Sequence, residues 1–349
     1  LRQDAMSFEP PFPADAALLA LLGSSNLGSR RPVFRRYDHQ VGDQTIVKPG
    51  GDAAVVRVEG SLRGLALSTD GNARYAALDP RAGARIAVCE AARNVVATGG
   101  EPLAVTNCLN FGNPDKPEIY WQLQESVAGI AEACKALGVP IVSGNVSLYN
   151  DSSGRSIDPT AVIGMVGLLE DVTRHCRPGF SVDNDLIALI GPVRAELGGS
   201  EYQRLATGRN EGERPRLDLE LELRVQRYVL EAIRAGLLRS AHDCAEGGLG
   251  VALAECSVIG GRGARVGIDE LAQHPGSGQW EAGILFGECQ SRFIVSFARE
   301  HLMELNEMAV RRDVPFRGLG STGGDRILIT GSIDIGLRQA EEAYDQALV

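Results

Sequence analysis

The sequence predicts an α/β (α+β) protein of two domains, and three observations support this prediction. The chain has 349 residues, a length that suggests about two domains. Two short apolar runs, at residues 102–105 and 139–142, enclose a segment in which apolar residues recur at helical spacing, the pattern of a strand–helix–strand unit. A polar segment at residues 173–184 separates the earlier predicted elements from the later ones. We therefore expect one domain over residues 1–172 and a second α/β domain over residues 173–349.

The composition excludes several classes of protein. No apolar run approaches the roughly 20 residues of a membrane-spanning helix, so we expect no membrane contact. The formal net charge is −10 without a basic cluster, which argues against nucleic-acid binding. An acidic protein can still handle phosphates by recruiting Mg²⁺ or backbone donors. The seven cysteines are scattered singly, which is typical of reduced thiols in a cytoplasmic protein.

The first predicted domain begins with a short helix at residues 14–22, and a strand follows Asp52. A second strand at residues 65–68 ends in Thr-Asp-Gly-Asn, and a helix at residues 84–97 ends at a Gly-Gly pair. Asp52 and Asp70 each lie beside glycine at a strand end. Carboxylates in that position commonly hold Mg²⁺, although Asp-Gly is also a frequent turn pair, so both interpretations stay open.

The strand–helix–strand unit organises the chain and extends from Val105 to Asn150. We expect its two apolar runs to be buried strands, joined by a right-handed crossover if they are parallel neighbours. Each strand is expected to end in a loop rich in Asn, Gly and Ser, at residues 106–114 and 143–150. Small and amide side chains there suit phosphate, ribose or a metal ion. The same residue types are the commonest in ordinary turns, so the residues alone do not decide between ligand loops and turns.

The later elements alternate between strands and helices. The predicted strands are residues 161–169, 185–191, 293–297 and 326–330, and the predicted helices are residues 218–235 and a segment opening at 240 and ending near 259. His242 and Asp243 are adjacent, which argues against a catalytic triad and favours a packing role. The following Gly-Gly pair can present backbone N–H groups to an anion. The chain has neither a Walker loop nor a strand-led G-x-G-x-x-G motif, so any ATP must bind by other means.

Several stretches, taken together and in order, are specific for one family. They are residues 37–39, 49–55, 91–96, 101–105, 109–114, 143–147, 242–249 and 285–292. Over nearly its whole length, from about Pro13 to Thr330, the chain resembles the C-terminal half of the synthetase subunit in the phosphoribosylformylglycinamidine synthase family. This family belongs to the aminoimidazole ribonucleotide synthetase superfamily. The resemblance implies a ferredoxin-like N-terminal domain followed by a second α/β domain.

The resemblance also implies a reaction in purine biosynthesis. ATP phosphorylates the amide oxygen of formylglycinamide ribonucleotide, and ammonia then displaces phosphate to form the amidine. Mg²⁺ offsets the triphosphate charge, and catalysis consists mainly of positioning and electrostatics. The implied partners are the N-terminal half of the same enzyme, a glutaminase subunit that supplies the ammonia, and a small accessory subunit.

In that family the catalytic base and the lysine that grips the triphosphate come from the N-terminal half. At the corresponding place this chain has Ser68 and Asn72, which can neither bind phosphate as a cation nor take a proton near neutral pH. Asp70 keeps a carboxylate that could hold Mg²⁺ or support a structural nucleotide. We therefore expect no catalytic residue in this chain and no turnover by the chain alone.

Four residues of the central unit match the family's ligand contacts. By resemblance, Asn107 and Gly144 contact ATP, Asn145 is a Mg²⁺ ligand through its carbonyl oxygen, and Ser147 contacts the ribonucleotide. The family often has Asp where this chain has Asn107, so a metal contact there is in doubt.

Two other interpretations compete with half of an ATP-dependent C–N ligase. One is a stand-alone enzyme like aminoimidazole ribonucleotide synthetase, although its lysine-bearing glycine-rich segment is missing near Asp70. The other is a non-catalytic, nucleotide-binding or purely structural scaffold.

Overall fold

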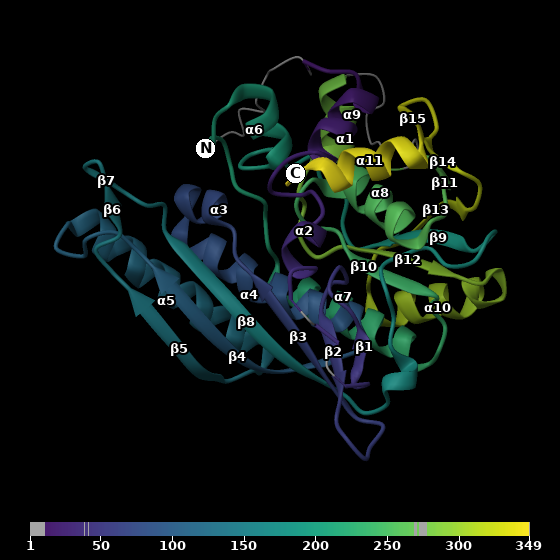
Figure 1. The fold of residues 1–349 in the computed structure, drawn as a ribbon, viewed down its shortest axis with the longest axis horizontal. Helices are drawn as coiled ribbons and strands as arrows, with labels where there is room; N and C mark the ends of the chain where they lie inside the picture. Colours follow the sequence, from purple (N-terminus) through teal and green to yellow (C-terminus); the bar gives the residue numbers. More distant parts are fainter. Residues whose placement is uncertain (1–10, 38, 41, 269–270, 272–277, 349) are drawn as a thin grey trace.

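The computed structural model describes residues 11–37, 39–40, 42–268, 271 and 278–348. Within these residues the chain forms a six-stranded and a seven-stranded sheet, each packed with helices, which confirms the predicted mixed fold. The first sheet lies at the lower left of Figure 1, and the second lies at the right. None of the helices in the described residues combines the length and the apolar character needed to cross a membrane.

The first sheet has one parallel pair of strands at its edge. Its strands, in spatial order, are β1 (Thr45–Val47), β2 (Ala54–Arg57), β3 (Gly64–Asp70), β8 (Thr160–Leu169), β4 (Glu101–Asn110) and β5 (Ile141–Ser147). Strands β4 and β5 pair in parallel, whereas the other neighbours pair antiparallel. The predicted strand–helix–strand unit therefore has its two strands side by side, with α5 (Pro117–Leu137) as the connection.

Helices α4 (Pro80–Ala97) and α5 cover one face of this sheet. Helix α4 begins earlier than predicted, because Pro80 suits the first helical position and the Asp79 carboxylate accepts a hydrogen bond from the Ala82 N–H. Helix α5 ends at Gly138, whose positive φ of 71° is readily adopted by glycine. Alternate residues of β3, β4 and β8 are buried against these two helices.

The opposite face of the first sheet carries no helix, and we call it the open face. Its apolar part is formed by side chains of β2, β3 and β8, namely Val56, Leu65, Leu67, Val162, Val166 and Leu168. The prediction that residues 139–142 form a buried strand is wrong. β5 is an edge strand of the sheet, and Val142 is 67% exposed.

The second sheet mixes antiparallel pairs with one parallel pair. Its strands, in spatial order, are β10 (Ser240–Asp243), β12 (Phe293–Phe297), β9 (Leu186–Ile190), β13 (Phe316–Thr322), β11 (Ala264–Val266), β14 (Arg326–Ile329) and β15 (Ile333–Gly336). The longer helices around it are α7 (Leu219–Arg234), α8 (Gly248–Gly260), α10 (Leu302–Arg312) and α11 (Leu337–Gln346). Residues 240–243, predicted as the start of a helix, form β10 instead, because their main chain pairs with β12.

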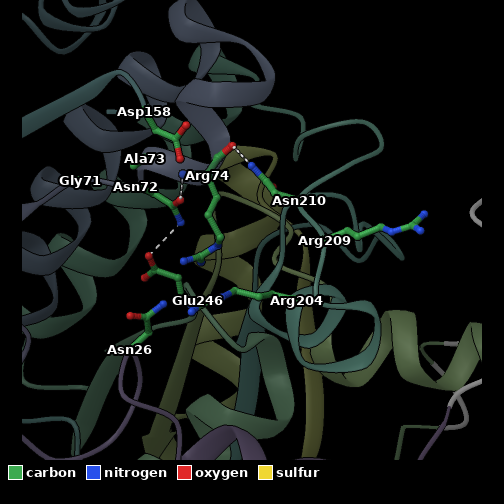
Figure 2. A pocket seen from close by; sticks show the side chains of 11 residues that line it. Asn26, Gly71, Asn72, Ala73, Arg74, Asp158, Arg204, Arg209, Asn210 and Glu246 are labelled. Atoms are coloured by element: carbon green, nitrogen blue, oxygen red, sulfur yellow. Dashed lines mark hydrogen bonds between the residues drawn. The ribbon is translucent and has the colours of Figure 1, made fainter. Parts of the chain in front are cut away.

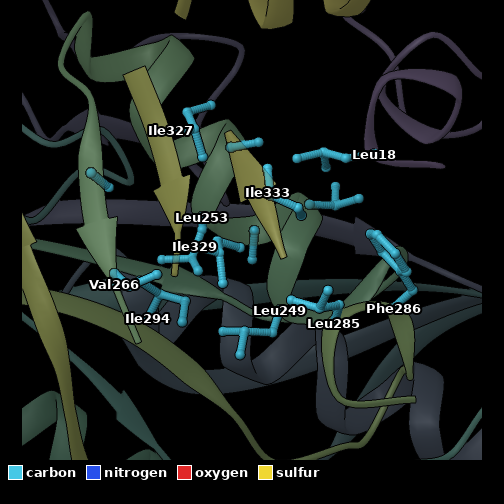
Figure 3. Close-up of a cluster of buried hydrophobic side chains, with 14 of the residues drawn as sticks. Leu18, Leu249, Leu253, Val266, Leu285, Phe286, Ile294, Ile327, Ile329 and Ile333 are labelled. Carbon is cyan, nitrogen blue, oxygen red and sulfur yellow. The ribbon is translucent and has the colours of Figure 1, made fainter. Parts of the chain in front are cut away.

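Helix α1 (Ala14–Leu22) packs into the core of the second sheet, although it precedes the first sheet in the chain. Its buried face includes Leu18, which belongs to the same hydrophobic cluster as Ile333 and Leu285 (Figure 3). The two ends of the described chain also meet, since the Ser29 N–H donates to the Tyr344 carbonyl oxygen at 2.8 Å. The expected domain boundary between residues 172 and 173 stays a prediction. All strands of the first sheet precede it, and all strands of the second sheet follow it. The first segment of the chain nevertheless packs with the second sheet.

Candidate functional site

The four predicted ligand contacts lie close together, but on strands rather than in loops. Strands β4 and β5 continue to Asn110 and Ser147, so they include residues predicted to be loops. In the parallel ladder Asn107 pairs with Gly144, and Cys108 pairs with Asn145. Polar side chains are compatible with strand structure here because β5 is an edge strand whose residues face solvent.

Asn107 and Gly144 share the helix-facing side of the strands. A Cβ atom at Gly144 would lie 2.3 Å from Asn107 Oδ1, so the Asn107 side chain occupies the space that the glycine leaves. The predicted reason for glycine at this position was close approach of a nucleotide. The structure shows a second and sufficient reason, which is close approach of a neighbouring side chain.

Asn145 and Ser147 lie on the open face, because successive side chains of a strand alternate between the two sides. The Ser147 hydroxyl lies 3.3 Å from Asn150 Oδ1. Asn150 also donates to the carbonyl oxygens of Phe111 and Ser147, both at 3.0 Å. These bonds fix the turn after β5 against the end of β4, so the Ser147 hydroxyl is held in a defined position.

The residues at the degenerate catalytic motif have structural roles. The Ser68 hydroxyl is buried and donates to the Ala91 carbonyl oxygen at 2.8 Å. Asn72 caps helix α3 (Ala73–Leu78), because its side-chain oxygen accepts from the backbone N–H groups of the first turn. Its Nδ2 donates to Glu246 at 3.0 Å. Neither residue is free to act on a phosphate.

Asp70 is a poor candidate for a metal ligand. Burial raises the pKa of its carboxyl to about 7, with further contributions from the Glu246 and Asp243 charges, while the Asn94 hydrogen bond opposes the shift. The Asn94 amide donates to Asp70 Oδ2 at 2.9 Å. In the part of the chain that the structure describes, no three His, Cys, Asp or Glu side chains are grouped so that they could hold a metal.

A buried arginine links the two sheets next to Asp70. Arg93 of α4 is fully buried, and its guanidinium contacts Asp243 at 2.7 Å, Glu222 at 3.1 Å and Glu90 at 3.6 Å. Gln290 accepts a further bond from it at 2.9 Å. Sequence reasoning missed this cluster because its partners lie up to 197 positions away. The available signal was the pair of charged residues Glu90 and Arg93 among the alanines and valines of a helical segment.

His242 forms a second ionic link between the sheets. Its Nδ1 lies 2.6 Å from Asp52 Oδ1, and its Nε2 lies 3.2 Å from Glu255 Oε2. Burial lowers the pKa of His242, but the two carboxylates outweigh that effect and raise it well above the usual value. Asp52 and Asp70 therefore have separate partners. The expected packing role of His242 agrees with this contact.

A cavity of about 550 Å³ lies beside the degenerate motif (Figure 2). Residues of both predicted domains line it, and Figure 2 shows Arg74, Glu246 and Asn26 around its interior. Arg74 has an ion pair with Glu201, and its second terminal nitrogen is buried without a hydrogen bond to any described residue. The cavity is thus polar, and Asn72 on its wall is engaged with Glu246.

The fold and the position of these strands define a class of protein. Residues 50–169 match the family model described as AIR synthase related protein, N-terminal domain, and residues 182–330 match the model for the C-terminal domain of the same family. Together the two matches cover most of the chain. The chain belongs to the AIR synthase related family.

Within this family, the curated relatives are phosphoribosylformylglycinamidine synthase subunits named PurL. The chain is 44% identical to PurL of Alkaliphilus metalliredigens over 99% of its own length and 46% of the relative. It is 48% identical to PurL of Thermomicrobium roseum over 97% of its own length and 46% of the relative. The chain thus spans about half the length of these relatives, and the resemblance found in the sequence is confirmed.

Solved structures agree with this assignment. PurL of T. maritima in complex with ATP is 25% identical with a TM-score of 0.58, over 84% of this chain and 40% of that one. The T. maritima PurL complex with FGAR has a TM-score of 0.78 at 18% identity, over 95% of this chain and 54% of that one, and supports the fold alone.

Proposed function

We propose that this chain is the C-terminal half of a PurL-type synthetase subunit. The whole enzyme converts formylglycinamide ribonucleotide, ATP and glutamine-derived ammonia to formylglycinamidine ribonucleotide, ADP and phosphate. The similarity to PurL subunits over nearly the whole chain supports this proposal, together with the 46% coverage of their length. The complex of T. maritima PurL with ATP concerns one of these substrates.

The main evidence for how the two halves share the active site is that the residues of the degenerate catalytic motif have hydrogen-bond partners within the fold. Ser68 and Asn72 hold backbone and carboxylate groups of the fold, so neither serves as a base or a phosphate contact. The β4–β5 edge, in contrast, presents Asn145 and Ser147 on an uncovered face. The chain therefore contributes ligand contacts to an active site whose base lies in the N-terminal half.

In this proposal Asn107 and Gly144 contact ATP, and Ser147 contacts the ribonucleotide. Asn145 supplies one carbonyl oxygen to a Mg²⁺ ion that arrives with the triphosphate. A single carbonyl oxygen from the protein fits this limited role, because water and phosphate oxygens supply most of the ligands of Mg²⁺. It does not fit a preformed site, since the described residues offer no cluster of metal-binding side chains. The protein's own contribution is to position the substrates.

The open face is the proposed docking surface for the N-terminal half. Leu65 and Leu67 of β3 are 38% and 43% exposed there, and Val56 of β2 is 36% exposed. A contiguous apolar surface of this kind commonly marks a protein interface. The glutaminase and the small accessory subunit are further proposed partners. This agrees with the solved PurLQS assembly of Thermotoga maritima, whose matching chain is 26% identical to this one.

The test is phosphate release from ATP in the presence of formylglycinamide ribonucleotide and ammonium. The chain alone should be inactive, and adding a separately produced N-terminal half should restore turnover. The restored activity should fall on Asn145→Ala substitution. Turnover by the chain alone would overturn the proposal, because the base would then have to lie within these residues.

If mixing gives no activity, binding of Mg-ATP and of the ribonucleotide to the intact subunit separates two explanations. If Asn145→Ala and Ser147→Ala weaken this binding, the proposal stands, and the lack of activity is explained by failed assembly of the two halves. Absence of binding to the intact subunit would favour the non-catalytic scaffold.

A further inference from the structure

The polar part of the open face extends beyond the predicted ligand contacts. On β4, Leu109 is buried against the helices, so Cys108 and Asn110 point to the other side. The parallel register places Cys108 beside Asn145 and Asn110 beside Ser147. Neighbouring strands are about 4.8 Å apart, so a group bound at Ser147 is within reach of Asn110.

The side-chain amide of Asn110 is oriented by its own strand. Its Nδ2 lies 3.3 Å from the Cys108 carbonyl oxygen and 3.5 Å from the Cys108 sulfur. A backbone carbonyl only accepts hydrogen bonds, so the amide nitrogen must be the atom on that side. The Oδ1 atom is then left without a hydrogen bond to any residue that the structure describes. Asn110 is half-buried, so this acceptor is directed by the fold and remains accessible.

We propose that Asn110 is a substrate-contacting residue that selects the ribonucleotide, and this inference rests on the proposed function. Its Oδ1 accepts a hydrogen bond from a neutral donor of the ligand held at Ser147, which is a ribose hydroxyl or an amide N–H. A phosphate group is disfavoured there, because its oxygens would meet the lone pairs of Oδ1. Asn110 therefore acts on the ribonucleotide and not on the triphosphate of ATP.

The experiment compares two variants in the intact synthetase subunit that carries this half. Asn110→Leu keeps the size of the side chain and removes the acceptor, whereas Asn110→Asp keeps an acceptor oxygen. We expect Asn110→Leu to weaken binding of formylglycinamide ribonucleotide about 10-fold, measured by titration calorimetry, which corresponds to about 1.4 kcal/mol. Mg-ATP affinity should be unchanged, and Asn110→Asp should retain more ribonucleotide affinity than Asn110→Leu.

The control is Leu302→Ala, at an exposed position on α10. This helix lies beside the second sheet, far from β4. Unfolding temperatures of all variants establish that they are folded. Equal ribonucleotide affinity in wild type and Asn110→Leu would overturn the inference while the proposed function stands. Equal weakening of ATP and ribonucleotide binding would also overturn it, since that result indicates a general distortion. No ribonucleotide binding by the wild-type subunit would overturn both the inference and the proposed function.

Discussion

At the scale of single residues, the site depends on one glycine that accommodates one asparagine. The contact between Gly144 and Asn107 Oδ1 leaves no space for a Cβ atom, which would lie at 2.3 Å. An added methyl group must displace the amide, and overpacking of this kind costs about 1–3 kcal/mol. The geometry of a proposed ATP contact is therefore set by a backbone position on the neighbouring strand.

We predict that Gly144→Ala lowers the unfolding temperature and weakens Mg-ATP binding in the intact subunit. Adding Asn107→Ala should restore the unfolding temperature, because the clash is removed, without restoring ATP affinity. Gly318→Ala is the matched control, since its Cβ would meet nothing within 4 Å. The measurements are thermal unfolding and calorimetric titration. A double variant that regains ATP binding would show that Asn107 is not a nucleotide contact.

Asp70 leads to a prediction about pH. Its pKa is about 7 in the folded chain and near 3.8 in the unfolded chain, so ionisation destabilises the fold as the pH rises between these values. The amide that replaces the carboxyl group in an Asp70→Asn variant does not ionise. The variant should therefore match wild type near pH 4 and exceed it above pH 7 by on the order of 2–4 kcal/mol.

Urea denaturation at several pH values measures this difference. Asp43→Asn, at an exposed position, is the control variant. If the stability difference for Asp70→Asn were constant with pH, the raised pKa would be wrong.

At the scale of secondary-structure elements, the sequence predicts most of the regular structure correctly. Helices α1, α5 and α7 and strands β8 and β12 appear where apolar periodicity places them. The errors concern residues whose environment is set by distant segments. β5 is exposed because of its place at the sheet edge, and β10 is a strand because β12 lies beside it. Neither fact is encoded in a local window of sequence.

The resemblance to a known family indicates which residues form the candidate site, but it does not give their arrangement in space. Asn145 and Ser147 share a face with Asn110 because of the parallel register of β4 and β5, which local spacing does not determine. The same limit applies to Arg93, whose carboxylate partners come from α4, α7 and β10. Long-range pairing therefore decides both the site and the ionic links that support it.

Helix α4 is attached to the second sheet through Arg93, and this contact leads to a prediction for Arg93→Met. The variant leaves Glu90, Glu222 and Asp243 buried without their cation. Breaking a buried ion pair in this way typically costs about 3–5 kcal/mol. Urea denaturation should show a loss of this size, with Arg338→Met, at a 91% exposed position on α11, as a control that changes little. If Arg93→Met were about as stable as wild type, hydration or protonation of the three carboxylates would have to compensate for the lost cation.

At the scale of the whole molecule, the first sheet has helices on one face only. The open face combines an apolar part on β2, β3 and β8 with the polar edge formed by β4 and β5. One docking event can therefore cover the apolar part and complete the ligand site at the same time. In the isolated chain this surface remains exposed and favours self-association.

We predict that Leu67→Lys weakens the association of the two separately produced halves by at least about 10-fold, because a lysine would lose its hydration in the interface. The unfolding temperature of the chain should change little, since Leu67 is 43% exposed. Val310→Lys, at a 75% exposed position on α10, is the control. Sedimentation velocity of the mixed halves measures the affinity. Unchanged association would place the docking surface elsewhere.

The packing of α1 against α11 and α8 also has a consequence for biosynthesis of the chain. The first sheet is built from one continuous stretch, residues 45–169, and all its strands are synthesised before the second sheet begins. The second core needs α1, which precedes the first sheet in the chain, and α11, which follows the last strand of the second sheet. Until translation reaches α11, the apolar face of α1 lacks part of its cover and must be kept from aggregating. The first sheet can therefore fold before the second core is complete, whereas the second core closes only once α11 has been synthesised.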